Sequence, residues 1–176
     1  MVAHTQITVD AFLELVENNP DKRFDITATG EVVEVSPKRI HSQIQVRFAV
    51  LFSDYLANNP LGTDYEVLTE CLHEIGGWLC QPDVSIDLKG KDEIVMTPPL
   101  VAVEIKSDSN TYKDQRAKAQ RYVELGTKMV ILTFAEKQLI EVYQVDMDDQ
   151  ILTVDDVLDG GDILLGFQVA VKDIFE

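Results

Sequence analysis

Two apolar runs of strand length, residues 80–88 and 100–107, constrain the fold more than any other feature of this chain. Both are rich in valine and isoleucine, which favour β-strands. Charged residues interrupt them: Asp83 near the start of the first run, Glu104 and Lys106 in the second. Successive side chains of a strand point to opposite faces, and neighbouring strands lie about 4.8 Å apart. If the two runs pair, the three charged side chains can converge on one point of a sheet.

The rest of the chain alternates between helical and strand patterns. Apolar residues at three- and four-residue steps favour helices, and short apolar segments bounded by Gly, Pro and Asn favour strands. The predicted helices begin at Thr8 and stop at 18–20, cover residues 40–58, and cover residues 110–125 with Gly126 as C-cap. The predicted strands are residues 24–26, 31–36, 64–71, 80–88, 100–107, 129–133 and 139–145, and the tail 151–176 favours turns and short strands. This order predicts a mixed α/β fold: a central mixed sheet flanked by helices, with an N-terminal helix and a β-rich C-terminal tail.

The length of 176 residues suits one domain, and no linker, repeat or low-complexity segment divides it. We therefore expect residues 1–176 to form a single domain. No stretch reaches the roughly 18 apolar residues of a membrane span, and the N-terminus lacks the pattern of a signal peptide. We expect a cytoplasmic protein that does not enter a membrane. The two cysteines, Cys71 and Cys80, have no zinc-ligand spacing and are expected to be free thiols.

The formal net charge of −16 comes from 15 Lys and Arg against 31 Asp and Glu. Proteins that bind DNA usually neutralise its phosphates with a basic face, so this charge argues against tight, non-specific DNA binding. The basic residues nevertheless cluster in one stretch of sequence, which is compatible with a local basic strip on an acidic body. The cluster consists of Lys106, Lys113, Arg116, Lys118, Arg121 and Lys128.

Two carboxylates and a lysine at one point of a sheet have a definite chemical use. Asp83 and Glu104 offer the hard oxygen ligands that Mg²⁺ and Mn²⁺ prefer. Such an ion activates water and stabilises charge on a phosphate, and Lys106 beside it can orient the attacking water. The alternative is an ordinary ion pair on a solvent-facing strand, because the Glu-x-Lys pattern is common on its own.

The order Pro-Asp, then Glu-x-Lys on the next strand, then a helix, resembles the PD-(D/E)XK or restriction-endonuclease-like nuclease superfamily, and more narrowly its Uma-two type. The matching segments are Thr8-x-x-x-Phe12-Leu13, residues 30–37, His41, Pro82-Asp83-Val84, residues 99–107, Lys118-x-x-x-Tyr122-x-x-x-Gly126, residues 166–169 and residues 173–175. The resemblance implies a restriction-endonuclease-like fold and hydrolysis of phosphodiester bonds in DNA that depends on Mg²⁺ or Mn²⁺. It implies Asp83 and Glu104 as metal ligands.

The resemblance leaves the identity of the site lysine open. Members often lack a lysine after the Glu-x step, and the lysine of the following helix, here Lys118, then substitutes for it. This chain has both Lys106 and Lys118. A solvated helix face is the alternative interpretation of Lys118. The family's earlier Glu-Leu-x-x-Gly stretch corresponds to residues 24–30 here, with one extra residue and Asp25 where Glu is usual, which argues against an accessory role for Asp25.

Glu34 and His41 are further candidates for the site. Glu34 lies on the strand before the long helix and either faces the site or points to solvent. His41 opens that helix and either contacts a phosphate, assists the metal, or is an exposed helix-start residue. We interpret Tyr122 as a packing residue.

Three functions are compatible with these patterns. The first is a DNA endonuclease whose metal-dependent nicking is lost in Glu104→Ala. The second, motivated by the net charge of −16, is a catalytically inactive nuclease-fold protein that acts as a binding or regulatory module and binds no Mg²⁺. The third is a structural homo-oligomer in which Asp83, Glu104 and Lys106 lie more than about 10 Å apart. An enzyme that cuts both strands of a duplex matches a two-fold axis, so we expect a homodimer.

Overall fold

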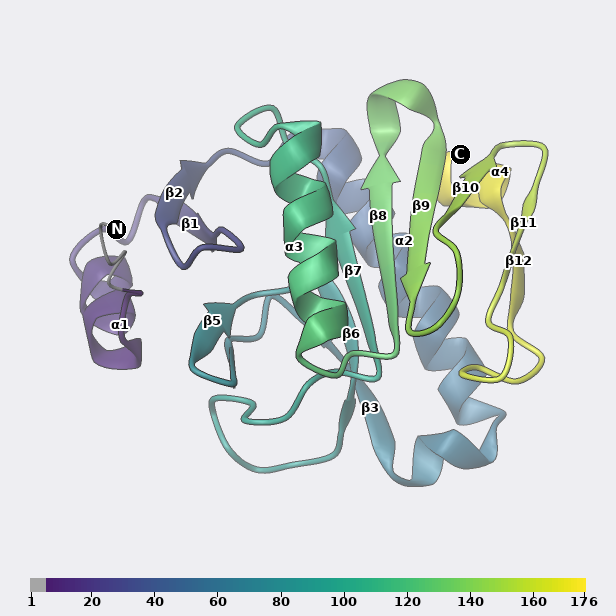
Figure 1. Cartoon of the computed structure of the whole chain (residues 1–176), viewed down its shortest axis with the longest axis horizontal. Coiled ribbons are helices and arrows are strands. Elements are labelled where there is room, and N and C mark those ends of the chain that lie inside the picture. Colours follow the sequence, from purple (N-terminus) through teal and green to yellow (C-terminus); the bar gives the residue numbers. More distant parts are fainter. Residues whose placement is uncertain (1–5) are drawn as a thin grey trace.

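A six-stranded mixed sheet lies at the centre of the computed structural model, which describes residues 6–176 (Figure 1). The strands are β3 (Tyr65–Thr69), β6 (Val84–Leu88), β7 (Val101–Ile105), β8 (Met129–Phe134), β9 (Leu139–Gln144) and β10 (Gln150–Thr153). Their order in the sheet is β10-β9-β8-β7-β6-β3. The neighbours β7 and β8 are parallel, and the other neighbouring pairs are antiparallel. The predicted mixed α/β fold is confirmed.

Two helices, α2 (Arg39–Ala57) and α3 (Tyr112–Glu124), cover opposite faces of this sheet (Figure 1). α2 buries apolar residues at four-residue steps, among them Phe48 and Phe52, against β6 and β7. α3 packs Tyr122 against the other face. The capping box of α3 and the four-residue spacing in α2 explain why these two segments are helical.

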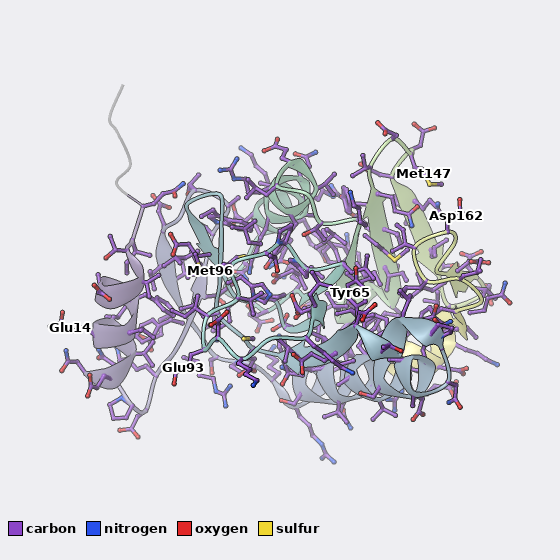
Figure 2. The ribbon with its side chains drawn as sticks, turned by 90° about the horizontal axis from the view of Figure 1, so that it is seen from below. Glu14, Tyr65, Glu93, Met96, Met147 and Asp162 are labelled. Atoms are coloured by element: carbon purple, nitrogen blue, oxygen red, sulfur yellow. The ribbon has the colours of Figure 1, made fainter. Side chains whose placement is uncertain are left out.

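Smaller elements surround this core. They are α1 (Val9–Glu17), β1 (Arg23–Ile26), β2 (Val32–Val35), β4 (His73–Ile75), β5 (Trp78–Cys80), β11 (Val157–Asp159), β12 (Gln168–Ala170), α4 (Val171–Phe175) and short 3-10 helices at Pro60–Thr63 and Ala135–Lys137. Figure 2 shows α1, with Glu14, at one end of the molecule and the loops with Met147 and Asp162 at the other. Within residues 6–176 no helix is long and apolar enough to cross a membrane. Cys71 and Cys80 are free thiols, as expected.

The hairpin of β1 and β2 is held against the rest of the protein by Trp78. This indole is fully buried, and its Nε1 donates a hydrogen bond of 2.9 Å to the carbonyl oxygen of Thr27, in the turn between the two strands. In the same region Phe12 of α1 and Ile26 of β1 join one small apolar cluster. These contacts fix the position of β1, which carries Asp25 toward the central sheet.

The structure differs from the sequence prediction at the ends of several elements. The predicted strand 80–88 is divided, because its first residue belongs to β5 and β6 begins only at Val84, after Pro82. β5 pairs with β4 around the two glycines Gly76 and Gly77, both with positive φ, in a hairpin that the sequence prediction missed. The predicted strand 100–107 stops at Ile105. The N-terminal helix and the short strands of the tail are present, but the tail ends in α4, which was not predicted.

Candidate catalytic site

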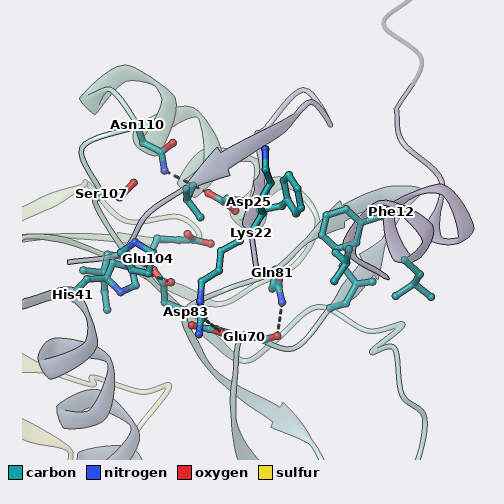
Figure 3. A pocket seen from close by; sticks show the side chains of 18 residues that line it. Phe12, Lys22, Asp25, His41, Glu70, Gln81, Asp83, Glu104, Ser107 and Asn110 are labelled. Carbon is teal, nitrogen blue, oxygen red and sulfur yellow. Dashed lines mark hydrogen bonds and ion pairs between the residues drawn. The ribbon is translucent and has the colours of Figure 1, made fainter. Parts of the chain in front are cut away.

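Asp83 and Glu104 line one cavity of about 300 Å³ beside the central sheet. Figure 3 shows them together with Asp25 and His41 around this cavity. Asp83 directly precedes β6, Glu104 lies on β7, Asp25 lies on β1, and His41 lies in the first turn of α2. Elements that are far apart in the sequence therefore supply the site.

The pairing of β6 with β7 explains why the two acids meet. Val84 lies opposite Val103 in this antiparallel pair, so one further step along the register places Asp83 opposite Glu104. Alternation along β7 sends Val103 into the core under α2 and turns Glu104 to the face that α3 covers. The two strand runs thus bring the two predicted metal ligands together, as the sequence indicates.

Asp83 is fixed by contacts at both carboxylate oxygens. Oδ2 accepts a hydrogen bond of 2.6 Å from the backbone N–H of Ile105, and Oδ1 lies 3.2 Å from Nε2 of His41. The backbone oxygen of Asp83 also accepts a hydrogen bond of 3.0 Å from Gln45 of α2. Burial alone would lower the pKa of His41, but the hydrogen bond and charge of Asp83, with smaller effects of Glu70 and Asp25, raise that pKa above its ordinary value. The imidazole is therefore a partner of the Asp83 carboxylate rather than an exposed helix-start residue.

Glu104 is a buried carboxylate with two donors. Its side chain is 3% exposed; Oε1 accepts a hydrogen bond of 2.9 Å from the hydroxyl of Tyr122, and Oε2 accepts one of 2.9 Å from Nζ of Lys118. Burial raises the pKa of Glu104; Lys118 opposes that rise, and the negative charges of Asp25 and Asp83 add to it. Tyr122 packs in the core, as interpreted from the sequence, and in addition holds this carboxylate.

Lys118 connects Glu104 to Asp25. Its Nζ donates hydrogen bonds of 2.7 Å to Oδ1 of Asp25 and 2.9 Å to Oε2 of Glu104, and the side chain is 3% exposed. Burial would lower the pKa of Lys118, but the two carboxylates outweigh it and hold that pKa above its ordinary value. The ammonium is therefore charged. Lys118 is therefore bonded to two carboxylates that line the cavity, although it does not line the cavity itself, and it does not lie on a solvated helix face.

Lys106 lies beside the cavity and does not line it. β7 ends at Ile105, so Lys106 lies just outside the strand, where the alternation of side chains need not continue. Its Nζ donates a hydrogen bond of 3.0 Å to the carbonyl oxygen of Ser107 and lies 5.1 Å from the centroid of the Tyr112 ring. The structure brings Asp83 and Glu104 together, with Lys118 in the position that was considered for Lys106.

Two acids of the β1–β2 hairpin lie in different environments. Glu34 has a 57% exposed side chain, pairs with Lys22 across 2.7 Å and is not among the residues that line the cavity. Asp25, to which the sequence gave no role, lines the cavity and accepts hydrogen bonds from Lys118, from the backbone of Ile26 and, at 3.4 Å, from Asn110. The one sequence signal for Asp25 was its place where the resembling family has Glu.

The donor set fits a hard divalent cation. Four carboxylates, Asp25, Glu70, Asp83 and Glu104, line the cavity, and the buried ammonium of Lys118 bonds two of them. Burial is the main cause of the raised pKa of Glu104, and the negative charges of Asp25 and Asp83 add to it. Within residues 6–176 no three His, Cys, Asp or Glu side chains stand together as a complete ligand set. Mg²⁺ does not require one, because it usually keeps several waters and is held by one or two carboxylates with substrate phosphate. Asp83 and Glu104 meet that requirement.

A solved structure of similar fold supports the fold assignment. A nuclease described as putative and belonging to DUF820, from Anabaena variabilis ATCC 29413, superposes with a TM-score of 0.80 at 20% sequence identity, covering 96% of this chain and 97% of that one. The DrdV–DNA complex gives a TM-score of 0.43 at 19% identity, over 79% of this chain but 12% of that one. No curated protein sequence matches.

Sequence comparison identifies the family directly. The model of the Uma2 family, described as "Putative restriction endonuclease", matches residues 9–172, which is nearly the whole chain. The matched range includes Asp83 and the β7 strand that carries Glu104. It also includes the α3 helix that carries Lys118 and the hairpin that carries Asp25. The chain belongs to the Uma2 family, and the resemblance to restriction-endonuclease-like nucleases inferred from its sequence motifs is confirmed.

Proposed function

We propose that this protein is a divalent-metal-dependent endonuclease that hydrolyses phosphodiester bonds of DNA. The observation that carries this proposal is the placement of Asp83 and Glu104, from neighbouring strands, in one cavity with the ammonium of Lys118 bonded to Glu104. Membership in the Uma2 family supports the reaction class. The local site is compatible with an acidic protein, because the net charge of −16 describes the whole chain and not this cavity.

Asp83 and Glu104 would hold Mg²⁺ or Mn²⁺. When bound, such an ion stabilises negative charge on phosphate oxygens and makes water a better nucleophile. The protein prepares both ligands: His41 and the Ile105 N–H orient the Asp83 carboxylate, and Tyr122 orients that of Glu104. Fixed ligands of this kind need no reorganisation when substrate arrives.

Lys118 serves the site in our proposal, in place of Lys106. Two of the three N–H groups of its ammonium donate to Asp25 and Glu104, and the third has no hydrogen-bond partner among residues 6–176. In our proposal this third N–H donates to a phosphate oxygen or to the attacking water. Because its pKa is raised, Lys118 stays protonated and acts as a hydrogen-bond donor rather than as a base. Asp25 then acts as a positioning residue that holds Lys118 between the hairpin and β7.

Nicking of supercoiled DNA tests the proposal. Wild-type protein should nick DNA with Mg²⁺ or Mn²⁺ and lose that activity with a chelator. Glu104→Gln preserves shape but removes the charge, and we expect a loss of about 10²-fold or more. The control is Glu124→Gln, because Glu124 is an exposed acid of α3 that pairs with Arg121. Equal nicking by the Glu104→Gln variant and the control would refute the proposal.

The alternative is a catalytically inactive nuclease-fold protein that acts as a binding or regulatory module. The net charge of −16 is the observation that favours it, because most of the surface repels a polyanion. Absence of Mg²⁺ and Mn²⁺ binding in a calorimetric titration would support this alternative over the endonuclease. For the endonuclease we retain three expectations: a single domain over residues 1–176, a homodimer whose two-fold axis matches duplex DNA, and a cytoplasmic location.

A further inference from the structure

A second cavity, of about 190 Å³, adjoins the catalytic cavity. His41 and Ser107 line both cavities, so the two are neighbours along one surface. The second cavity is bordered by the first turn of α2, with Lys38 and Ile40, and by Lys106. It therefore lies where a polymer that enters the catalytic cavity would continue.

The first turn of α2 is arranged to receive an anion. The backbone N–H groups at a helix start have no partner within the helix, and the helix dipole places partial positive charge there. The N-cap residue of this 19-residue helix is Lys38, which makes no side-chain capping bond, and the first turn contains no acid. Lys38 and Arg39 add positive charge at an end where cations are ordinarily unfavourable. A bound anion would satisfy the N–H groups and offset this repulsion.

His41 supplies an independent sign of a missing partner. Its side chain is 10% exposed, and Nε2 faces Asp83, whereas Nδ1 is buried and has no hydrogen-bond partner among the described residues. Buried polar atoms of native proteins are usually paired, so an unpaired ring nitrogen next to two cavities calls for a ligand. An anion, or a water held by one, can supply the partner.

Lys106 is free to contribute positive charge to the same cavity. Among the described residues its ammonium makes one hydrogen bond, to the carbonyl oxygen of Ser107. It lies 5.1 Å from the centroid of the Tyr112 ring, and the ammonium of Lys137 lies 3.9 Å from the same centroid. Two acids line this cavity as well: Asp108, which pairs with Lys38, and Glu136. Both members of the Lys38–Asp108 pair are more than half exposed, so the pair is weak and can be displaced.

We propose that the second cavity binds the phosphate next to the scissile phosphate of a nucleic-acid strand, through Lys106 and the first turn of α2. This inference rests on the proposed function, because it assumes that the scissile phosphate occupies the catalytic cavity. It assigns Lys106 to substrate binding and explains why a chain with Lys118 in the site also keeps a lysine after Glu104. A phosphodiester backbone is the substrate feature recognised, whatever the bases.

Binding of a fluorescent single-stranded oligonucleotide to metal-free protein, followed by anisotropy, tests this subsite without requiring cleavage. We compare Lys106→Gln with Lys38→Ser, in which a hydroxyl caps the helix and occupies its N–H groups. The matched control is Lys172→Gln, because Lys172 is an exposed lysine of α4. We expect Lys106→Gln and Lys38→Ser to weaken binding by about tenfold and Lys172→Gln to leave it unchanged. The slope of log affinity against log salt should fall by about 0.7 in the Lys106→Gln variant.

Cleavage kinetics add a second readout where the protein is active. Removal of a residue that binds a neighbouring phosphate should raise KM and leave kcat nearly unchanged. A melting temperature for Lys38→Ser that is equal to or above that of wild type, together with weaker binding, separates an anion site from a structural role. Lys106→Gln and Lys172→Gln variants with the same affinity and the same salt slope would overturn the proposal. Intact oligonucleotide binding without any cleavage would instead contradict the proposed function and leave the subsite in place.

Discussion

Replacing Lys118 by methionine should cost stability in a way that depends on pH. The substitution keeps most of the side-chain volume but removes the ammonium that donates to Glu104 and Asp25. Because Glu104 is 3% exposed, an uncompensated carboxylate would be left in the interior, which typically costs about 3–5 kcal/mol. Under the proposed function the same change also removes a hydrogen-bond donor from the substrate site, so we expect nicking to fall by about 10²-fold.

The pH dependence follows from the direction of the Glu104 pKa. Burial already raises this pKa above 4.5, and loss of Lys118, which opposes that rise, must raise it further. At pH values above the ordinary carboxylate pKa, Glu104 of the folded variant then holds a proton that Glu104 of the unfolded chain has lost. The stability of the variant therefore rises as pH falls. We expect the difference from wild type to be largest near pH 8 and smaller near pH 5, measured by urea unfolding.

Lys106→Met is the matched control for this prediction. Lys106 is only partly buried and its ammonium bonds a single carbonyl oxygen, so its removal should change stability by no more than about 1 kcal/mol. If Lys118→Met unfolds at the same urea concentration as Lys106→Met at both pH values, then Lys118 does not neutralise a buried carboxylate and the description of the site is wrong.

Three further predictions concern the surroundings of the two acids. Tyr122→Phe removes the hydroxyl that donates to Glu104 but keeps the packed ring, so urea unfolding should show a loss of about 1.5–3 kcal/mol; an unchanged midpoint would exclude this bond. Metal affinity, measured by calorimetry, should fall as pH drops from 8 to 6, because protons compete for Glu104 whose pKa is raised; a flat profile would contradict that direction. Trp78→Phe removes the hydrogen bond that anchors the turn of the β1–β2 hairpin, so amide hydrogen exchange in β1 should be faster than in wild type while exchange in β7 is unchanged. An unchanged exchange rate in β1 would show that another contact anchors the hairpin.

The two acids could be predicted from sequence because they depend on local rules. Alternation along a strand and pairing of adjacent strand runs are enough to place Asp83 near Glu104. The position of Lys106 could not be predicted by the same rules, because it depends on where β7 ends, and the ends of strands are the least predictable part of a sequence pattern. One residue at the end of a strand decides whether a side chain still alternates.

The contributions of other segments depend on tertiary packing that sequence patterns do not contain. Asp25 reaches the site because Trp78 and a small apolar cluster hold its hairpin in place, a contact across 51 positions of sequence. His73 had no partner pattern, yet the fold buries it completely, with Nε2 2.9 Å from Asp87. In both cases the partner is far away in sequence, so neither periodicity nor a short motif could indicate it.

The most direct test is calorimetric titration of Mn²⁺ and Mg²⁺ into wild-type protein, Asp83→Asn, Glu104→Gln and the Glu124→Gln control. The central claim is that the Asp83 and Glu104 carboxylates bind a divalent ion together. It predicts binding by wild type and control, and a loss of affinity of at least about tenfold in each of the other two variants. Absence of binding to wild type, or equal affinity in all four proteins, would contradict it.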